Sequence, residues 1–251
     1  MSNAVQAAAS SLPLFHHSIE PLNVDLHAGL RLNRGAGFGF SAGMATVPIG
    51  LGEFEAAAHS YPILFTDTNP PVPVVLLGFR PGWNLFVNEL GGWLPGAYVP
   101  ALVRAFPFAI IEDAATGTRQ FGFEADAACI SPTTGLPLFE GGQPTGVVKE
   151  AVAFCEACQA EMNASRAFAA ALDRVRLLEP QTATIEPRGG GKVSIDGFRV
   201  VDRNRLAGVH DEVMLAWRWR NWLLPLYAHL LSMANWTPFT ELAINQLAAR
   251  Q

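Results

Sequence analysis

Residues 138–152 read Leu-Phe-Glu-Gly-Gly-Gln-Pro-Thr-Gly-Val-Val-Lys-Glu-Ala-Val, and the pattern of the sequence changes within this stretch. Before Gly141 and Gly142, glycine and proline separate short runs of β-branched and aromatic residues, which is typical of strands. After them the apolar residues follow a helical period, and Thr145 can cap a helix that begins at about Gly146. The change predicts an α+β fold, in which a twisted antiparallel sheet from the N-terminal half packs against helices of the C-terminal half.

Six runs in the first half are predicted to be strands of one sheet over about residues 44–125. They are residues 45–49, 63–66, 72–79, 85–88, 108–112 and 119–123. The glycines between the runs favour hairpin turns over crossover helices. Residues 53–59 are predicted to form a short helix, which ends before Pro62 because the residue before a proline is forced out of the helical region.

The second half is predicted to be mainly helical. Helices are expected over residues 146–162, 165–178, 203–222 and 225–234. Ser165 and Asp202 can begin two of these helices as N-caps. A β-hairpin with arms at 182–186 and 193–201, turned by residues 187–191, is expected to add strands to the sheet.

The chain is predicted to be a single domain over residues 1–251, with a β-rich part up to residue 142 and a helical part from residue 143. A chain of this length can bury one large core. Residues 1–18 and 247–251 are expected to be frayed ends.

The composition excludes several classes of protein. Half of the residues are hydrophobic and 16% are charged, which excludes intrinsic disorder for most of the chain. The formal net charge is −5 and the basic residues form no cluster, so no nucleic-acid partner is expected. The longest apolar stretches are interrupted by Arg104 and by Pro225 and fall short of the roughly 20 residues that span a membrane, so no transmembrane segment is predicted.

The three cysteines are too few for a disulfide framework and fit a reducing compartment. No signal peptide can be read near the N-terminus. The protein is therefore predicted to be cytoplasmic, with the cell surface reached by a signal-less route as the alternative. Cys155 and Cys158 have the spacing of a redox or zinc motif, but they lie inside a predicted helix without a second pair. We expect them to be buried, reduced and free of metal.

No metal site and no cofactor is predicted. Asp25 and His27, with His16 and His17 nearby, are metal-binding residue types, but they lie in an arm that is expected to be poorly structured. The glycine-rich run at residues 35–43 lacks the Gly-Lys-Ser/Thr ending of a phosphate loop and precedes a strand instead of following one.

His229 and Ser232 share a face of a predicted helix, so a nucleophile and base can be imagined there. The sequence has no Gly-x-Ser-x-Gly elbow. The pair is therefore expected to bridge neighbouring elements, and the catalytic residues, if there are any, remain unknown.

Polar residues embedded in the apolar first half are the candidate ligand-binding residues. They are Arg80, Trp83, Asn84, Trp93, Tyr98 and Arg104. One interpretation is a cleft with guanidinium and amide donors between aromatic walls, suited to a carboxylate, a sugar or a peptide backbone. The other, which we favour, is structural, because an arginine is seldom buried without a partner. In that case Arg80 and Arg104 pair with Glu53, Asp67 or Asp113.

Trp217, Trp219 and Trp222 cannot share one stripe of a helix, because successive residues turn by about 100°. At least one of them is expected to face solvent or a partner. Two alternatives stay open: a wide buried face, and a contact with a protein or a lipid surface.

Several separated blocks of the chain carry a family resemblance. They are YPILFT at 61–66, LLGFRPGWNLFVN at 76–88, WLPGAYVPALVRAFPF at 93–108, LFEGGQPT at 138–145, GFRVVD at 197–202 and LYAHLLSMAN at 226–235. In order and spacing, over about residues 44–236, they resemble the SapC family of proteins associated with bacterial surface layers. Blocks in a fixed order are more specific than one short motif.

The resemblance implies a non-catalytic binding or assembly factor of the surface layer or cell envelope. Its partner would be an envelope protein of a surface layer or of an outer-membrane uptake system, and the oligomeric state is not implied. The alternative is an enzyme that acts on a small polar or peptide substrate in a cleft formed by Arg80, Asn84, Tyr98 and Arg104.

The chain departs from the family pattern at a few positions. Leu102 and Ala105 stand where the family has a second aromatic residue and a second arginine, which weakens any site that needs an arginine pair. Arg203 replaces an acidic residue, and Asn221 stands where the family favours glycine.

Overall fold

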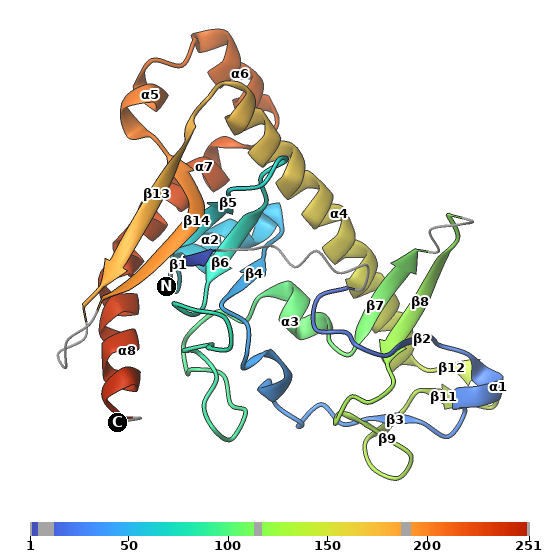
Figure 1. Cartoon of the computed structure of the whole chain (residues 1–251). Coiled ribbons are helices and arrows are strands. Elements are labelled where there is room, and N and C mark those ends of the chain that lie inside the picture. Colours follow the sequence, from blue (N-terminus) through green and yellow to red (C-terminus); the bar gives the residue numbers. More distant parts are fainter. Residues whose placement is uncertain (1, 5–12, 113–116, 187–191, 250–251) are drawn as a thin grey trace.

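One helix of 29 residues, α4 (Gly146–Arg174), runs along the molecule and joins its two β-rich parts (Figure 1). The computed structural model describes residues 2–4, 13–112, 117–186 and 192–249. Helices combine with several antiparallel sheets, so the predicted α+β fold class is confirmed.

The main sheet has the strand order β1-β14-β5-β6-β4, and β13 also pairs with β14. The strands are β1 (Ser2–Ala4), β4 (Thr46–Pro48), β5 (Ile63–Thr66), β6 (Pro73–Leu76), β13 (Leu178–Ile185) and β14 (Val193–Val201). The predicted hairpin does join the sheet: β14 is antiparallel to both β13 and β5, and Phe198 lies opposite Thr66. The turn predicted at 187–191 lies outside the described residues. β1 pairs with β14 in parallel, which the sequence did not predict.

The sheet expected over residues 44–125 is divided in two. β7 (Phe108–Glu112) and β8 (Arg119–Glu124) pair with β2 (Ile19–Pro21) and not with the main sheet. Residues 77–107 between the two sheets are rich in glycine and proline, and they carry the chain from the main sheet to a part of α4 that contacts β7.

No strand forms at residues 85–88, where the sequence predicts one; Val87 makes a single bridge to Trp93. The side chains of Asn84 and Asn88 accept hydrogen bonds from the backbone N–H groups of Phe86 (2.9 Å) and Gly92 (2.8 Å). Such local bonds compete with a strand ladder and shape a loop instead.

Short elements complete the second β-rich part. They are α1 (Val24–His27), β3 (Arg31–Leu32), β9 (Ile130–Ser131), β10 (Leu136–Pro137), β11 (Phe139–Glu140) and β12 (Gln143–Pro144). β3 lies between β9 and β10, and β11 pairs with β12. These ladders lead directly into α4.

The helices predicted at 146–162 and 165–178 are one continuous helix, α4, which ends at Arg174. Ser165 is not an N-cap: it is buried inside the helix, and its hydroxyl donates to the backbone oxygen of Ile49 at 2.7 Å. Thr145 occupies the N-cap position, but its hydroxyl donates to the oxygen of Pro137 (2.8 Å) instead of accepting a cap bond.

The helix predicted at 203–222 is broken into α5 (Arg203–Ala207) and α6 (Asp211–Trp219). Asp202 is the predicted N-cap, and its side chain accepts from the N–H groups of Asn204 and Arg205. Asn221 has a φ of 56° between α6 and the next helix. This left-handed conformation favours glycine, and among other residues asparagine tolerates it best. The positive φ explains why Asn221 can stand where the family favours glycine.

The remaining helices are α2 (Phe54–Ala58), α3 (Ala101–Ala105), α7 (Leu223–Ser232) and α8 (Trp236–Ala249), with single 3₁₀ turns at η1 (Gly39–Ser41), η2 (Leu51–Glu53) and η3 (Met233–Asn235). The expected fraying is wrong at both ends of the chain where the structure describes it. α8 extends to Ala249, and Phe15 and His16 are buried.

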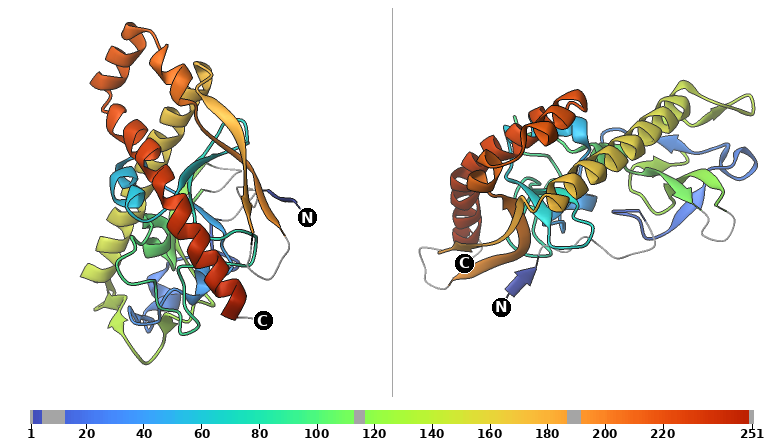
Figure 2. Two further views of the ribbon diagram at one scale, coloured as in Figure 1. Left: turned by 90° about the vertical axis from the view of Figure 1, so that its left-hand side faces the viewer. Right: turned by 90° about the horizontal axis from the view of Figure 1, so that it is seen from above.

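Two hydrophobic clusters lie along α4. The larger one fills the space between the main sheet and the helices, with Tyr61, Phe65 and Phe168 fully buried. The smaller one lies beneath the first half of α4 and includes Phe108 and Phe123. Figure 2 shows α4 extending from the β13–β14 hairpin to the second β-rich part, with α7 and α8 following one another along one side. Among the described residues, none of the helices combines the length and the apolar character needed to cross a membrane.

Candidate functional site

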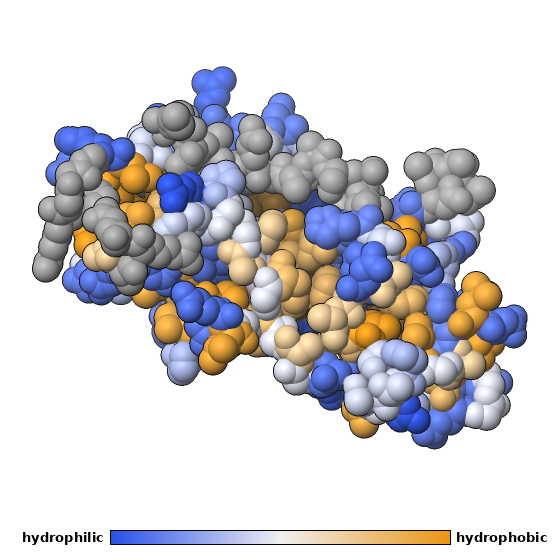
Figure 3. Space-filling model, turned by 60° about the horizontal axis from the view of Figure 1, so that its bottom comes forward, coloured by the Kyte–Doolittle hydropathy of each residue, from blue (hydrophilic) through white to orange (hydrophobic). Residues whose placement is uncertain are grey.

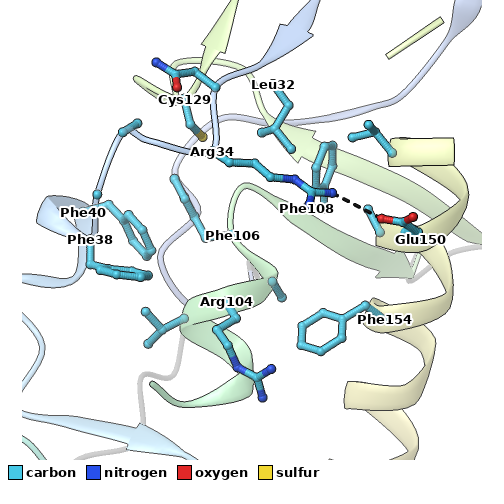
Figure 4. A pocket seen from close by; sticks show the side chains of 17 residues that line it. Leu32, Arg34, Phe38, Phe40, Arg104, Phe106, Phe108, Cys129, Glu150 and Phe154 are labelled. Carbon is cyan, nitrogen blue, oxygen red and sulfur yellow. Dashed lines mark hydrogen bonds and ion pairs between the residues drawn. The ribbon is translucent and has the colours of Figure 1, made fainter. Parts of the chain in front are cut away.

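A cavity of about 490 Å³ lies between the loop after β3, the junction of α3 with β7, and α4 (Figure 4). Its walls are largely aromatic, and we call it the aromatic pocket. The aromatic rings are those of Phe38, Phe40, Phe106, Phe108 and Phe154. Figure 3 shows apolar residues gathered across the centre of the face seen when the bottom of the molecule comes forward.

Local packing fixes the rings of the aromatic pocket. Phe40 lies on η1 and Phe106 directly follows α3; their rings stack with centroids 3.8 Å apart and planes 17° apart. Phe154 belongs to α4, where Val147 and Ala151 precede it by seven and three residues and therefore line the same side. Each wall thus rests on a different segment of the chain.

Two arginines flank the aromatic pocket. Arg34 reaches Glu150 on α4, with Nη2 and Oε2 3.2 Å apart (Figure 4). Both side chains are exposed, so this pair adds little to stability. The guanidinium of Arg104 lies 5.1 Å from the centroid of the Phe154 ring, which is within the range of a cation–π contact.

Hydrogen bonds hold the Arg104 side chain in place. Its Nε donates to the oxygen of Val99 and its Nη2 to the hydroxyl of Tyr98, both at 3.1 Å. The Tyr98 hydroxyl donates in turn to Glu53 at 3.0 Å. Burial, together with the charge of Glu53, raises the pKa of Tyr98 to about 12. At neutral pH Tyr98 is therefore a fixed hydrogen-bond donor and not a general base.

Glu53 is the buried anchor of this network. Its carboxylate also accepts from the backbone N–H groups of Ala101 (2.6 Å) and Gly50 (2.7 Å). From the sequence, Glu53 is one of the carboxylates predicted to form an ion pair with Arg80 or Arg104. The structure instead places the Tyr98 hydroxyl between Glu53 and Arg104.

The other proposed ion pairs do not form among the described residues: no carboxylate there lies within 4 Å of either Arg80 or Arg104. Asp67 pairs with Arg199, at 3.3 Å between Oδ1 and Nε. Asp113 lies outside the described residues.

The six predicted ligand-binding residues are divided. Arg80 is exposed, and its guanidinium lies 4.3 Å from the centroid of the Trp83 ring. Asn84 is buried and donates to the oxygen of Ser41 at 3.1 Å. These three residues do not line the aromatic pocket.

Trp93 and Tyr98 are joined through Tyr61. The indole N–H of Trp93 donates to the Tyr61 hydroxyl at 3.1 Å, and that hydroxyl donates to the backbone oxygen of Tyr98. Of the six, Arg104 alone lines the aromatic pocket. Ligand binding stays a prediction for all six.

The phenylalanines of the aromatic pocket are functional candidates that the sequence reasoning missed. Phe38 and Phe40 lie in the glycine-rich run 35–43, whose glycines suggest comparison with a phosphate loop and draw attention away from its two phenylalanines. Phe106 and Phe108 lie in the block that carries the family resemblance. The phenylalanines close to Arg104 in the sequence could have indicated an aromatic site. Nothing in the sequence shows that Phe154 of α4 lies next to them in the fold.

Cys155 and Cys158 are buried on α4, as expected, and are not bonded to each other. They line a second cavity of about 410 Å³ on the other side of Phe108 and Ala105. Burial raises the pKa of Cys155 to about 12 and that of Cys158 to about 11. Both are therefore neutral thiols at physiological pH, a form that is neither a nucleophile nor a good metal ligand.

His229 and Ser232 tie α7 to the main sheet. His229 accepts from the N–H of Val201 at 3.0 Å through Nε2, and its Nδ1 donates to the oxygen of Ile63 at 2.8 Å. Ser232 accepts from the N–H of Ile63 at 3.0 Å and donates to the oxygen of His229. Both side chains are fully engaged with backbone, which agrees with the bridging role expected from the sequence.

Acidification is expected to destabilise the protein through His229. Complete burial lowers its pKa from 6.5 to about 4. The unfolded chain therefore binds an extra proton between these pH values, and stability falls as the pH decreases through this window. From about pH 7.5 to about pH 5 the loss is about 2 kcal/mol. Urea unfolding at both pH values measures it.

Two variants isolate the contribution of His229. His229→Gln is expected to reduce the difference in unfolding free energy between the two pH values. The control is His59→Gln, at an exposed position after α2. It is expected to show the same difference in unfolding free energy between the two pH values as the wild type. An unchanged pH dependence in His229→Gln would show that other groups cause it.

The remaining metal-binding residue types do not assemble. Nε2 of His27 lies 3.5 Å from Oε2 of Glu20. The ring nitrogens of His16 lie within hydrogen-bond distance of the backbone oxygens of Leu14 and Pro107. Across the part of the chain that the structure describes, no three His, Cys, Asp or Glu side chains are grouped to hold a metal ion.

Comparison with known proteins adds one match. A family model described as SapC matches residues 22–238. No curated protein and no solved structure matches the chain.

Proposed function

The chain belongs to the SapC family, and from this we propose that it is a non-catalytic binding protein of the bacterial surface layer or cell envelope. In this proposal the aromatic pocket holds an apolar group of the ligand or protein partner. The surface-layer or envelope assignment rests on the family resemblance, and the binding role rests on the aromatic pocket.

One observation carries the binding role: a cavity of about 490 Å³ with phenylalanine on several sides and Arg104 beside it. This volume is within the range of small-molecule sites, which are mostly apolar with a few placed polar groups. Arg104 keeps N–H groups beyond those bonded to Val99 and Tyr98. The ligand group that fits is therefore apolar, with a carboxylate or another anion at one end.

The same lining supports binding over catalysis. The described residues of the aromatic pocket include no His, Ser, Asp or Lys. Burial raises the pKa of Cys129 to about 11, so its thiol is neutral. Glu150 is paired with Arg34. A nucleophile beside a base, which covalent catalysis requires, is not present among these groups.

Filling the cavity tests the proposal. Anilinonaphthalene sulfonate, which joins aromatic rings to an anion, is titrated by fluorescence. Ala151→Trp places an indole in the aromatic pocket and is expected to weaken binding at least about tenfold, or about 1.4 kcal/mol. The matched control is Ala153→Trp, at an exposed position of α4 that does not line the cavity. Equal binding by both variants would contradict the proposal.

Removing the cation tests the anion preference. Arg104→Met is expected to weaken binding of anilinonaphthalene sulfonate by about five- to tenfold, because a charge-assisted hydrogen bond is lost. Binding of the uncharged N-phenylnaphthylamine is expected to stay the same. Arg80→Met is the control and should bind both probes as the wild type does. Equal loss of both probes in Arg104→Met would mean that the arginine only supports the wall.

A further inference from the structure

We propose that helices α6 and α7 form a docking surface for an anionic lipid bilayer, on which the protein lies without crossing it. The surface consists of Leu215 and Trp219 on α6 and Leu224, Tyr227 and Leu231 on α7, and we call it the α6–α7 face. It is separate from the aromatic pocket, none of whose lining residues it shares.

Exposed apolar side chains are concentrated on the α6–α7 face. Of the ten exposed large hydrophobic side chains among the described residues, five belong to it. Trp219 is 80% exposed and Leu231 is 72% exposed. Trp217 and Trp222 are buried, so the sequence expectation that at least one tryptophan of this segment faces outward is confirmed at Trp219.

The spacing of the exposed apolar residues places them on one face of α7. Leu224, Tyr227 and Leu231 follow one another at intervals of three and four residues, which places them on one stripe of α7. The opposite stripe, with Leu226 and His229, is buried against the fold. α7 is thus apolar on both sides, and only one side has a partner within the described part of the chain.

On α6 the apolar residues that face outward are Leu215 and Trp219, one turn apart, while Trp217 is buried. Arg218 and Arg220 precede and follow Trp219 in the sequence, and both are exposed; the guanidinium of Arg220 lies 4.9 Å from the centroid of the Trp222 ring. Tryptophan beside arginine is typical of groups at a membrane interface, where the ring enters the headgroup layer and the guanidinium meets phosphate.

The end of the molecule that carries α6 is locally basic. Residues 173–176 and 202–220 contain six arginines against four carboxylates, although the whole chain has more acidic than basic residues. Asp202 pairs with Arg205, one of the six, and Asp173 pairs with Arg199 outside these ranges. Five arginines and two carboxylates of the two ranges remain. This charge asymmetry would orient the basic end toward an anionic surface.

The helices of this face lie toward one end of the molecule. α5, α6 and the C-terminal end of α4 lie together at that end (Figure 1), and α7 leads from there to α8 along one side (Figure 2). The two cavities described above lie elsewhere. An amphipathic helix with arginine, tryptophan and leucine on its outer face can bury that face at the level of the headgroups.

Vesicle sedimentation with the full chain tests the proposal. Vesicles of phosphatidylcholine with about a quarter phosphatidylglycerol are compared with vesicles of phosphatidylcholine alone. We expect the wild type to bind the anionic vesicles at least about tenfold more tightly. Trp219→Gln with Leu231→Gln is expected to lose at least tenfold in this binding. The matched control, Leu26→Gln with Leu90→Gln, removes exposed leucines elsewhere and should bind as the wild type does.

A second variant, Arg218→Gln with Arg220→Gln, is expected to abolish the preference for anionic vesicles; retention of the full preference would overturn the role of charge. No sedimentation of the wild type with anionic vesicles, or equal loss in the control pair, would overturn the proposal. So would a lipid-free dimer, seen by light scattering, that Trp219→Gln with Leu231→Gln dissociates, because a second copy would then cover the α6–α7 face.

Discussion

Replacing Arg199 with methionine is expected to lower the free energy of unfolding by about 2–3 kcal/mol. The side chain is only 12% exposed, and its Nη1 lies 2.7 Å from the Asp173 carboxylate. It also donates to the backbone oxygens of Thr66 and Thr68. The change leaves the buried backbone oxygen of Thr66 and the partly exposed carboxylate of Asp173 without their donor where α4, β14 and the end of β5 meet, and an acceptor that loses a charged donor is costly.

Urea unfolding of Arg199→Met beside Arg205→Met measures this effect. Arg205 pairs with Asp202, but its side chain is 53% exposed, so the control is expected to lose less than about 1 kcal/mol. Similar losses in the two variants would show that Arg199 is an ordinary surface arginine.

Gly78→Ala is expected to cost about 4 kcal/mol or to prevent folding. A Cβ at this position would lie 1.8 Å from the backbone oxygen of Trp83 and 3.3 Å from the Cα of Ala45. Because both neighbours are backbone atoms, no rotamer change can relieve the contact, and the loop that follows β6 would have to move.

The matched control is Gly146→Ala, at the first residue of α4, where an added Cβ meets nothing within 4 Å. Since alanine is the better helix former, this variant should be as stable as the wild type or slightly more stable. Thermal unfolding compares the two. A Gly78→Ala protein that melts with the wild type would contradict the close approach seen after β6.

Local patterns in the sequence predicted local structure well. Ile63–Thr66 and Phe108–Glu112 are strands with the predicted bounds, because β-branched and aromatic runs between turn residues have few alternatives. The assignment of strands to sheets could not be predicted in the same way. β14 pairs with β5 across more than a hundred residues of chain, and β8 pairs with β2 from the N-terminal arm.

Helix ends depended on tertiary contacts. Ser165 has the chemistry of an N-cap, yet in the structure its hydroxyl reaches Ile49 from inside α4. The hydroxyl bonds to a buried acceptor on another element instead of capping a helix, and a local sequence pattern cannot predict such an acceptor.

The candidate site was predictable only at Arg104. An arginine in an apolar segment needs an explanation, so the sequence singles out Arg104, and in the structure Arg104 lines the aromatic pocket. The walls of the aromatic pocket come from Phe40, Phe106 and Phe154, which are far apart in the sequence and meet only because α4 passes both α3 and β7. Arg80 has the same chemistry and is exposed like Arg104, but it lies beside Trp83 and does not line the aromatic pocket.

A crystal structure of the protein with anilinonaphthalene sulfonate bound would locate the binding site directly. We predict that the rings of the probe lie in the aromatic pocket against Phe154 and Phe106, with the sulfonate within hydrogen-bond distance of Arg104. A probe bound at another place, with the aromatic pocket empty, would contradict the binding function that we propose.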